Sequence, residues 1–240
     1  MSRAWLITGA SRGIGAAIAR RVVADGDRVA LVSRGDAVEA LASELGEAAH
    51  AIRADLTADG APASVVEAAA DTLGGLDVVV NNAAVHRGGR IDRLDPADFD
   101  AVLDADLRAP FAVCKAAAPR LGEGGAIVNI GAVVGLRGFP GDAPYGAAKA
   151  GLTGLTLVLA VELAPRGVRV NMVVPGFTPT EMTGALDARA RERILGRIPL
   201  GRAAAAAEIA DVVAWVAAST YMTGAVVPVD GGLMAALGGR

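Results

Sequence analysis

The sequence predicts an α/β fold, in which one doubly wound parallel sheet of about seven strands carries helices on both faces. Short apolar runs alternate with segments of helical spacing, which is the pattern of repeated strand-helix units. Hydrophobic residues make up 53% of the 240 positions and aromatic residues only 3%, so aliphatic side chains must build the core. No linker, composition shift or internal repeat divides the chain, and we therefore expect a single domain over residues 1–240.

The expected strands are short apolar runs bounded by polar or glycine-rich segments, as strands buried on both faces should be. They lie at 4–8, 28–33, 51–55, 76–81, 126–130, 168–174 and 225–229.

The expected helices have apolar residues at a spacing of three to four. They lie at 14–24, 38–45, 65–73, 99–121 and 145–164, and a last one follows the alanine run 203–207, with Ile209, Val212, Val213 and Val216 on its inner face. The segment 177–199 is the one long interruption of the pattern, and we expect it to form a lid over the substrate site.

Charge and cysteine content exclude several kinds of partner. The net charge of −3 provides no cluster of cations for nucleic acid or an anionic membrane. Cys114 is the single cysteine, so an intrachain disulfide or a multi-thiolate metal site is excluded, and its apolar neighbours predict a buried side chain. The N-terminus lacks the apolar run of a signal peptide, and we expect a cytoplasmic protein without a metal site.

A glycine-rich turn directly follows the first expected strand and opens a helix. Its spacing, G-x-x-x-G-x-G, lets the backbone turn tightly and approach a pyrophosphate, whose charge is met by amide N–H groups and the helix N-terminus. This position in the chain predicts a dinucleotide site in a Rossmann-like fold. The residues expected to bind the cofactor here are Gly9, Ser11, Arg12, Gly13, Ile14 and Gly15.

The end of the second strand indicates which coenzyme is preferred. An acidic residue there would bind the ribose 2′-hydroxyl of NAD, whereas an arginine suits the 2′-phosphate of NADP. The strand ends in Ser33 and Arg34, and Arg12 in the turn adds a second cation. These residues favour NADP(H), while Asp36 favours NAD slightly but also fits a cap of the following helix.

Tyr145 and Lys149 are four residues apart in an expected helix, so both side chains lie on one face. A free tyrosine has a pKa of about 10 and is a poor acid or base at neutral pH, and a nearby ammonium group lowers that pKa. The pair therefore predicts a site of proton transfer in which Lys149 tunes Tyr145.

The glycine turn and five further motifs in order resemble the short-chain dehydrogenase/reductase family, and in particular its 3-oxoacyl-[acyl-carrier-protein] reductases. The further motifs are Asp55-Leu56, Asn81-Asn82-Ala83-Ala84, Tyr145-x-x-x-Lys149, Asn171 to Gly176, and Asp230-Gly231-Gly232.

The resemblance implies that Tyr145 protonates the substrate oxygen as hydride arrives from the nicotinamide, and that Lys149 also holds the nicotinamide ribose. It adds further cofactor-binding residues and implies a small-molecule or carrier-bound substrate. The added residues are Asp55, Leu56, Asn82, Ala83, Tyr145, Lys149, Pro175, Gly176, Phe177, Thr178 and Thr180.

A homo-oligomer is also expected, because the helix from Tyr145 is apolar nearly all round. The family resemblance suggests a tetramer.

Two positions depart from the family pattern. The family usually has a serine about 13 residues before the tyrosine, where this chain has Ala132, and no Ser or Thr lies between Thr72 and Thr153. The family also usually has an asparagine, in the preceding helix, where this chain has Asp106. A carboxylate there would favour protonated Lys149 and partly offset the effect of the ammonium group on Tyr145.

Three explanations of Ala132 stay open at this point. The serine was deliberately removed, or another polar residue polarises the substrate, with His86 and Asp142 as candidates, or the chain binds the cofactor without turnover. The function expected is NADPH-dependent reduction of a 3-oxoacyl thioester or a biosynthetic ketone to an alcohol. The alternatives are reduction of a C=N bond, which the carboxylates of Asp106 and Asp142 would favour, and a non-enzymatic NADP(H)-binding protein.

Overall fold

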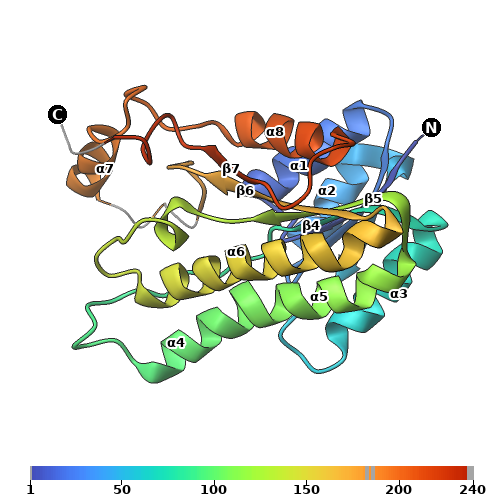
Figure 1. Cartoon of the computed structure of the whole chain (residues 1–240), viewed down its shortest axis with the longest axis horizontal. Coiled ribbons are helices and arrows are strands. Elements are labelled where there is room, and N and C mark those ends of the chain that lie inside the picture. Colours follow the sequence, from blue (N-terminus) through green and yellow to red (C-terminus); the bar gives the residue numbers. More distant parts are fainter. Residues whose placement is uncertain (1, 182–183, 185–186, 237–240) are drawn as a thin grey trace.

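The computed structural model describes residues 2–181, 184 and 187–236. Within these residues seven parallel strands form one sheet in the order β3-β2-β1-β4-β5-β6-β7 (Figure 1). The α/β architecture expected from the sequence is confirmed. The strands are β1 (Ala4–Thr8), β2 (Arg28–Ser33), β3 (Ala49–Arg53), β4 (Leu76–Asn81), β5 (Leu121–Ile130), β6 (Arg169–Pro175) and β7 (Val226–Val229).

The helices cover both faces of the sheet, with α1, α2 and α8 on one side and α3 to α6 on the other (Figure 1). Apolar side chains of each layer pack on the sheet in separate clusters, which is why the strands are buried on both faces. The helices are α1 (Gly13–Ala24), α2 (Ala37–Leu45), α3 (Ala61–Leu73), α4 (Pro96–Leu103), α5 (Ala109–Ala117), α6 (Ala143–Leu163), α7 (Ala188–Leu195) and α8 (Ala206–Ala218).

A chain of buried polar side chains links the centre of the sheet to α6. Asn81 and Asn129 are paired across β4 and β5, and the amide of Asn81 donates to Asn129 at 2.8 Å. Asn129 donates in turn to the hydroxyl of Thr156 on α6 at 2.9 Å. Because buried polar groups are costly unless they are hydrogen-bonded, these bonds fix α6 against the strand ends that carry the site.

The helix expected at 99–121 is wrong as a single element. It is divided into α4, a π-helical turn at Asp104–Arg108, and α5. Pro110 explains the division, because proline has no N–H to donate to the carbonyl four residues earlier, which is that of Asp106. The π turn therefore falls at the residue that the sequence analysis assigned to the site.

Strand boundaries differ from expectation in two places. β3 spans 49–53 rather than 51–55, which places His50 inside the strand, and Asp55 lies beyond it in a turn. β5 begins at Leu121 rather than at 126, because an irregular glycine-rich stretch precedes the regular pairing with β4. β6 and β7 differ by one residue from the expected bounds.

Two expectations concerned side chains on α5 and α6: that Cys114 is buried, and that one long helix carries both Tyr145 and Lys149. Cys114 is buried in α5, where burial raises the pKa of its thiol to about 12. The helix α6 and the turn after it, Ala143–Arg166, are long and apolar enough to cross a membrane by length and composition. However, α6 packs along the sheet and carries Tyr145 and Lys149, as a core helix of a folded domain would.

Candidate active site

A cavity of about 540 Å³ opens at the carboxyl ends of the strands, where ligands bind in doubly wound sheets. It is lined by the glycine turn, the segments that follow β2 to β6, and the start of α6. Of the site residues predicted from the sequence, Gly15 and Asp106 do not line it. Those that do are Gly9, Ser11, Arg12, Gly13, Ile14, Arg34, Asp55, Leu56, Asn82, Ala83, His86, Ala132, Asp142, Tyr145, Lys149, Pro175, Gly176, Phe177, Thr178 and Thr180.

The glycine turn forms a cradle that a dinucleotide fits. Gly9 has a φ of 64°, which favours glycine, and a Cβ there would lie 2.7 Å from the Cα of Ala83. A Cβ on Gly15 would lie 2.3 Å from the carbonyl oxygen of Gly9. The amide of Asn82 donates to that same carbonyl at 3.0 Å, so Asn82 supports the turn from behind.

The end of β2 offers donors for a phosphate. Ser33 lines the cavity and its hydroxyl donates to Ser11 at 3.0 Å, beside Arg34. Ser33 was not among the predicted cofactor residues, although its place directly before Arg34 could have indicated it. Asp36 does not line the cavity. It stands at the N-cap position of α2, as the sequence suggested, but its carboxylate makes no capping bond and pairs with Arg53 at 3.1 Å.

Asp55 lies in the turn after β3, on the same side of the cavity. Its carboxylate accepts hydrogen bonds from the backbone N–H of Thr57 at 3.0 Å and from the Thr57 hydroxyl at 2.7 Å. These bonds lower the pKa of Asp55, so it remains charged and holds the turn in shape.

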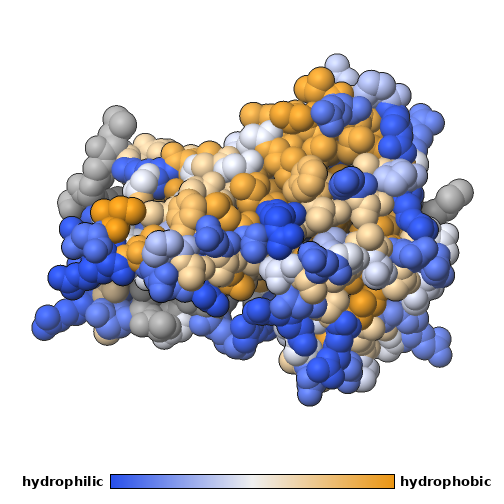
Figure 2. All heavy atoms as spheres, turned by 90° about the horizontal axis from the view of Figure 1, so that it is seen from below, coloured by the Kyte–Doolittle hydropathy of each residue, from blue (hydrophilic) through white to orange (hydrophobic). Residues whose placement is uncertain are grey.

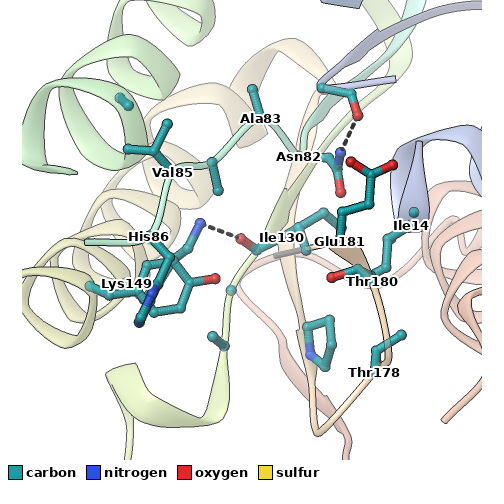
Figure 3. A pocket seen from close by; sticks show the side chains of 18 of the residues that line it. Ile14, Asn82, Ala83, Val85, His86, Ile130, Lys149, Thr178, Thr180 and Glu181 are labelled. Atoms are coloured by element: carbon teal, nitrogen blue, oxygen red, sulfur yellow. Dashed lines mark hydrogen bonds between the residues drawn. The ribbon is translucent and has the colours of Figure 1, made fainter. Parts of the chain in front are cut away.

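Lys149 is held at the cavity wall by two contacts, of which Figure 3 shows the one to Ile130. Its Nζ atom donates to the carbonyl of Ile130 at 3.2 Å and lies 3.3 Å from Oδ2 of Asp106. The same Nζ atom is 5.3 Å from the ring centroid of Tyr145. Asp106 itself is fully buried behind Lys149, where its Oδ1 accepts the backbone N–H of Val85 at 2.8 Å.

Lys149 lowers the pKa of Tyr145, as expected from the sequence, but the net shift in the pKa of Tyr145 is upward. Burial raises the pKa of Tyr145, and the ammonium group of Lys149 opposes that rise, whereas the carboxylate of Asp106 adds to it. Burial works against the charge of Lys149, but Tyr145 and Asp106 outweigh it and raise the pKa of Lys149. Burial also raises the pKa of Asp106, against the attraction of Lys149. Lys149 is therefore charged and Tyr145 protonated at neutral pH.

Asp106→Asn is expected to shift the ionisation of Tyr145 to lower pH. Removing the carboxylate removes a negative charge that disfavours tyrosinate, while Lys149 keeps its positive charge. The chain has two tyrosines, so in a Tyr221→Phe background the ultraviolet absorbance of tyrosinate reports Tyr145 alone. Asp104→Asn, which changes the exposed carboxylate two residues earlier, is the matched control. An unchanged or upward titration in Asp106→Asn would contradict the assigned electrostatics.

His86, Asp142 and Ala132 line the substrate end of the cavity. Nε2 of His86 and Oδ1 of Asp142 are 2.8 Å apart, and the His86 ring meets the Tyr145 ring edge-on with centroids 5.4 Å apart. The hydrogen bond that Nε2 of His86 donates to Asp142 raises the pKa of His86 despite its partial burial. The structure thus brings together two residues that are 56 positions apart in the sequence.

The segment expected to be a lid borders the cavity at several points. Phe177, Thr178, Thr180, Glu181 and Ile194 line it, and Ile194 comes from α7. Glu181 forms an ion pair with Arg12 of the glycine turn. Residues 182–183 and 185–186 of this segment lie outside the described residues.

Other lining residues were not predicted. Phe139 and Pro140 come from the loop between β5 and α6, and Leu233 follows the Asp230-Gly231-Gly232 motif. Arg137 in that loop donates to the carbonyl of Leu233 at 2.7 Å, which ties the two segments together. Apolar residues in loops give no sequence signal of their own. The loop between β5 and α6 precedes Tyr145, and Leu233 follows the Asp230-Gly231-Gly232 motif, so these motifs could have indicated both segments.

Comparisons with known proteins agree with this geometry. A model of the family described as Enoyl-(Acyl carrier protein) reductase matches residues 9–234. The 3-oxoacyl-[acyl-carrier-protein] reductase FabG of Staphylococcus aureus is 38% identical over 242 residues, with 97% of this chain and 98% of that protein covered. Carbonyl reductase family member 4 of Danio rerio is 39% identical over 236 residues, also with 97% and 98% covered.

Solved structures show the same likeness. A short chain dehydrogenase from Burkholderia cenocepacia J2315, in complex with NADP, has a TM-score of 0.92 and 39% identity, with 97% of this chain and 98% of that chain covered. The family match extends over nearly the whole chain, and the relatives cover it almost completely. The chain therefore belongs to the short-chain dehydrogenase/reductase family.

Proposed function

We propose that the protein reduces a carbonyl to an alcohol with NADPH, acting on a 3-oxoacyl thioester or a biosynthetic ketone. The observation that carries the proposal is the position of Tyr145 and Lys149 on the wall of the same cavity that the glycine turn borders. The names of the Staphylococcus aureus and Danio rerio relatives support carbonyl reduction, and the Burkholderia cenocepacia complex supports NADP. We further propose a cytoplasmic enzyme.

The proposed roles of the cofactor residues come from the family resemblance and from the position of these residues on the wall of the cavity. The glycine turn would hold the pyrophosphate, and Asp55 and Leu56 would border the adenine. Ser11, Ser33 and Arg34 would hold the 2′-phosphate. Asn82, Ala83, Lys149 and the segment from Pro175 to Thr180 would surround the nicotinamide end. When bound, NADPH supplies the hydride.

The side chains supply the proton and hold the charges in place. Tyr145 donates its hydroxyl proton to the carbonyl oxygen as negative charge develops there. Lys149 stabilises the resulting tyrosinate, and Asp106 positions Lys149 from behind. Ala132 stands where the family usually has serine, so it supplies no hydroxyl to the substrate.

The structure gives little support to the C=N alternative. An imine has less need of a hydroxyl donor, which suits Ala132, but the alternative also depended on two carboxylates at the substrate. Asp106 is fully buried behind Lys149 and does not line the cavity. Asp142 does line it, but its Oδ1 is hydrogen-bonded to His86.

A spectrophotometric screen of NADPH oxidation tests the proposal. The panel contains 3-oxoacyl thioesters, ketones, enoyl thioesters and cyclic imines. Turnover of a 3-oxoacyl thioester or a ketone supports the proposal. Turnover only of enoyl thioesters would assign C=C reduction, turnover only of imines would assign C=N reduction, and NADPH binding without any turnover would assign a binding protein.

Arg34→Asp is expected to weaken NADP(H) binding by about tenfold to a hundredfold, because a charge-assisted bond to the 2′-phosphate is lost. Binding of NAD(H) should improve relative to NADP(H), since the new carboxylate can accept from the 2′-hydroxyl. Calorimetry with both coenzymes measures the change. Arg93→Asp is the matched control, because Arg93 is exposed and does not line the cavity. Equal affinity for both coenzymes in the unmutated chain would contradict the assignment.

A homo-oligomer, proposed to be a tetramer, is expected from the apolar surface of α5 and α6. Phe111, Leu157, Val158 and Val161 are exposed there, and Figure 2 shows apolar atoms gathered on the side of the molecule where these helices lie. Such a surface is normally covered by a partner. Light scattering at micromolar concentration should give a multiple of the chain mass, and a mass near 24 kDa would contradict the expectation.

A further inference from the structure

His86 and Asp142 form a hydrogen-bonded pair at the substrate end of the cavity, next to Tyr145. The separation of 2.8 Å between Nε2 and Oδ1 is that of a strong, charge-assisted bond, and the His86 ring contacts the ring of the proposed proton donor. Among the described residues no other hydrogen bond involves the imidazole, and His86 lines the cavity, so its second nitrogen, Nδ1, is available to a ligand there.

The carboxylate of Asp142 is directed to His86 instead of serving its own helix. Asp142 is the N-cap residue of α6, a position where an aspartate usually accepts the N–H of the second or third helical residue. The second helical residue is Pro144, which has no N–H, and the side chain makes no capping bond. The side chain of Asp142 thus adds little to the stability of the start of α6, and its hydrogen bond is made to His86 instead.

The backbone also holds the two partners together. The N–H of Gly89 donates to the carbonyl of Gly141 at 2.9 Å, which ties the segment after β4 to the start of α6. A Cβ on Gly88 would lie 2.7 Å from that same carbonyl oxygen, so the close approach requires glycine there. The pair is therefore held by a fixed backbone contact and does not depend on two mobile side chains alone.

We propose that His86, positioned by Asp142, donates the second hydrogen bond to the carbonyl oxygen of the substrate. This inference rests on the proposed function. Tyr145 supplies the first donor, and the stretch 73–152, which carries His86, Ala132, Asp142 and Tyr145, contains no serine or threonine. The imidazole replaces the hydroxyl that Ala132 lacks.

The reduction step involves one hydride and one proton. Hydride adds to the carbonyl carbon, the π electron pair moves to the oxygen, and the oxygen takes the proton of the Tyr145 hydroxyl. The Nδ1–H of His86 stabilises the developing negative charge and keeps its proton, and Tyr145 regains one proton from solvent in each turnover.

The charges around His86 determine the pH range in which its Nδ1 atom carries a proton. Asp142 hydrogen-bonds to it, Asp106 adds a second negative charge, and Tyr145 contacts its ring, with Nζ of Lys149 5.3 Å from the centroid of the Tyr145 ring. Asp142 and Asp106 raise the pKa of His86 above its ordinary value of 6.5. Below that pKa both nitrogens carry protons, so Nδ1 donates. Above it Asp142 retains the Nε2 proton, Nδ1 becomes an acceptor, and carbonyl reduction should fall.

His86→Gln tests this role, because glutamine can still donate to Asp142 but cannot take up a proton. The expected result is a fall of about tenfold to a hundredfold in kcat/KM for carbonyl reduction, less than an enclosed donor would cost because His86 is partly exposed. The fall in rate with rising pH should disappear as well. His50→Gln is the matched control, because His50 is the only other histidine and lies in β3, away from the cavity.

The histidine titrations give a readout that does not depend on turnover. NMR of a chain with two histidines shows two imidazole signals, and His50→Gln identifies the one from His86. Asp142→Asn should move the His86 titration to lower pH, since the charge that favours imidazolium is removed. The pH at which carbonyl reduction declines should move in the same direction.

A combined variant separates a donor role from a structural one. Ala132→Ser adds a hydroxyl at the substrate end, and it should raise kcat much more in the His86→Gln background than in the unmutated chain. A merely structural histidine would give equal gains in both backgrounds and would overturn the proposal. Unchanged kcat/KM or an unchanged pH profile in His86→Gln would also overturn it, while carbonyl reduction itself stood. Absence of carbonyl turnover in the unmutated chain would instead refute the proposed function.

Discussion

Tyr145→Phe is expected to lower kcat for carbonyl reduction by about 10² to 10⁴, the usual contribution of a positioned general acid. The variant removes one hydroxyl and keeps the ring, so packing against His86 and Lys149 should persist. Cofactor affinity should change little, which distinguishes loss of the proton donor from loss of the site. Steady-state kinetics and NADPH calorimetry measure the two quantities separately.

The control for this variant is Tyr221→Phe, the same change at the only other tyrosine, whose side chain is fully exposed. It should retain the kcat and thermal midpoint of the unmutated chain. A Tyr145→Phe variant that kept more than about a tenth of the original kcat would show that the substrate oxygen receives its proton elsewhere.

Gly15→Ala is expected to weaken NADPH binding about fivefold to a hundredfold. The added methyl group would lie 2.3 Å from the carbonyl oxygen of Gly9 and 2.6 Å from the amide nitrogen of Asn82, so the turn must shift. Overpacking of this kind costs about 1 to 3 kcal/mol. If the whole cost falls on the turn that binds the cofactor, it gives the expected fold-change in the dissociation constant of NADPH. Calorimetry measures the affinity, and the thermal midpoint reports any part of the cost that falls on folding.

Gly35→Ala is the matched control, since a Cβ there meets no atom within 4 Å. It should bind NADPH normally and be slightly more stable, because alanine restricts the unfolded chain. Normal affinity and stability in Gly15→Ala would show that the turn adapts without cost, and would remove the argument that the cradle is preformed.

Periodicity and motif spacing predicted the layers of the fold because local sequence determines them. The runs at 4–8, 28–33 and 76–81 have the same bounds as β1, β2 and β4, since each is a largely apolar stretch bounded by glycine or polar residues. The helix expected at 99–121 was wrong because Pro110 acts on the hydrogen bond of a residue one turn earlier, and hydrophobic spacing does not register a missing N–H.

The site could be predicted in part for the same reason. Glycines and the Tyr145-Lys149 pair are local patterns, so their placement on one cavity followed from the topology of the sheet. The pairing of His86 with Asp142 joins two separate loops, and only the folded chain sets that distance. Asp106 was expected to act at the site, but its burial behind Lys149 depends on the π turn, which hydrophobic spacing does not indicate.

Because α4, the π turn at Asp104–Arg108 and α5 are continuous, the number of residues in them determines which neighbour each side chain faces. Each residue rotates an α-helix by about 100°, so one additional residue turns everything after it toward a different neighbour. The segment before the turn packs on α6 and the segment after it packs on α3. A substitution at Ala105 would alter one side chain. A deletion there would reset the phase of all that follows, turning Cys114 out of the core or Asp106 away from Lys149.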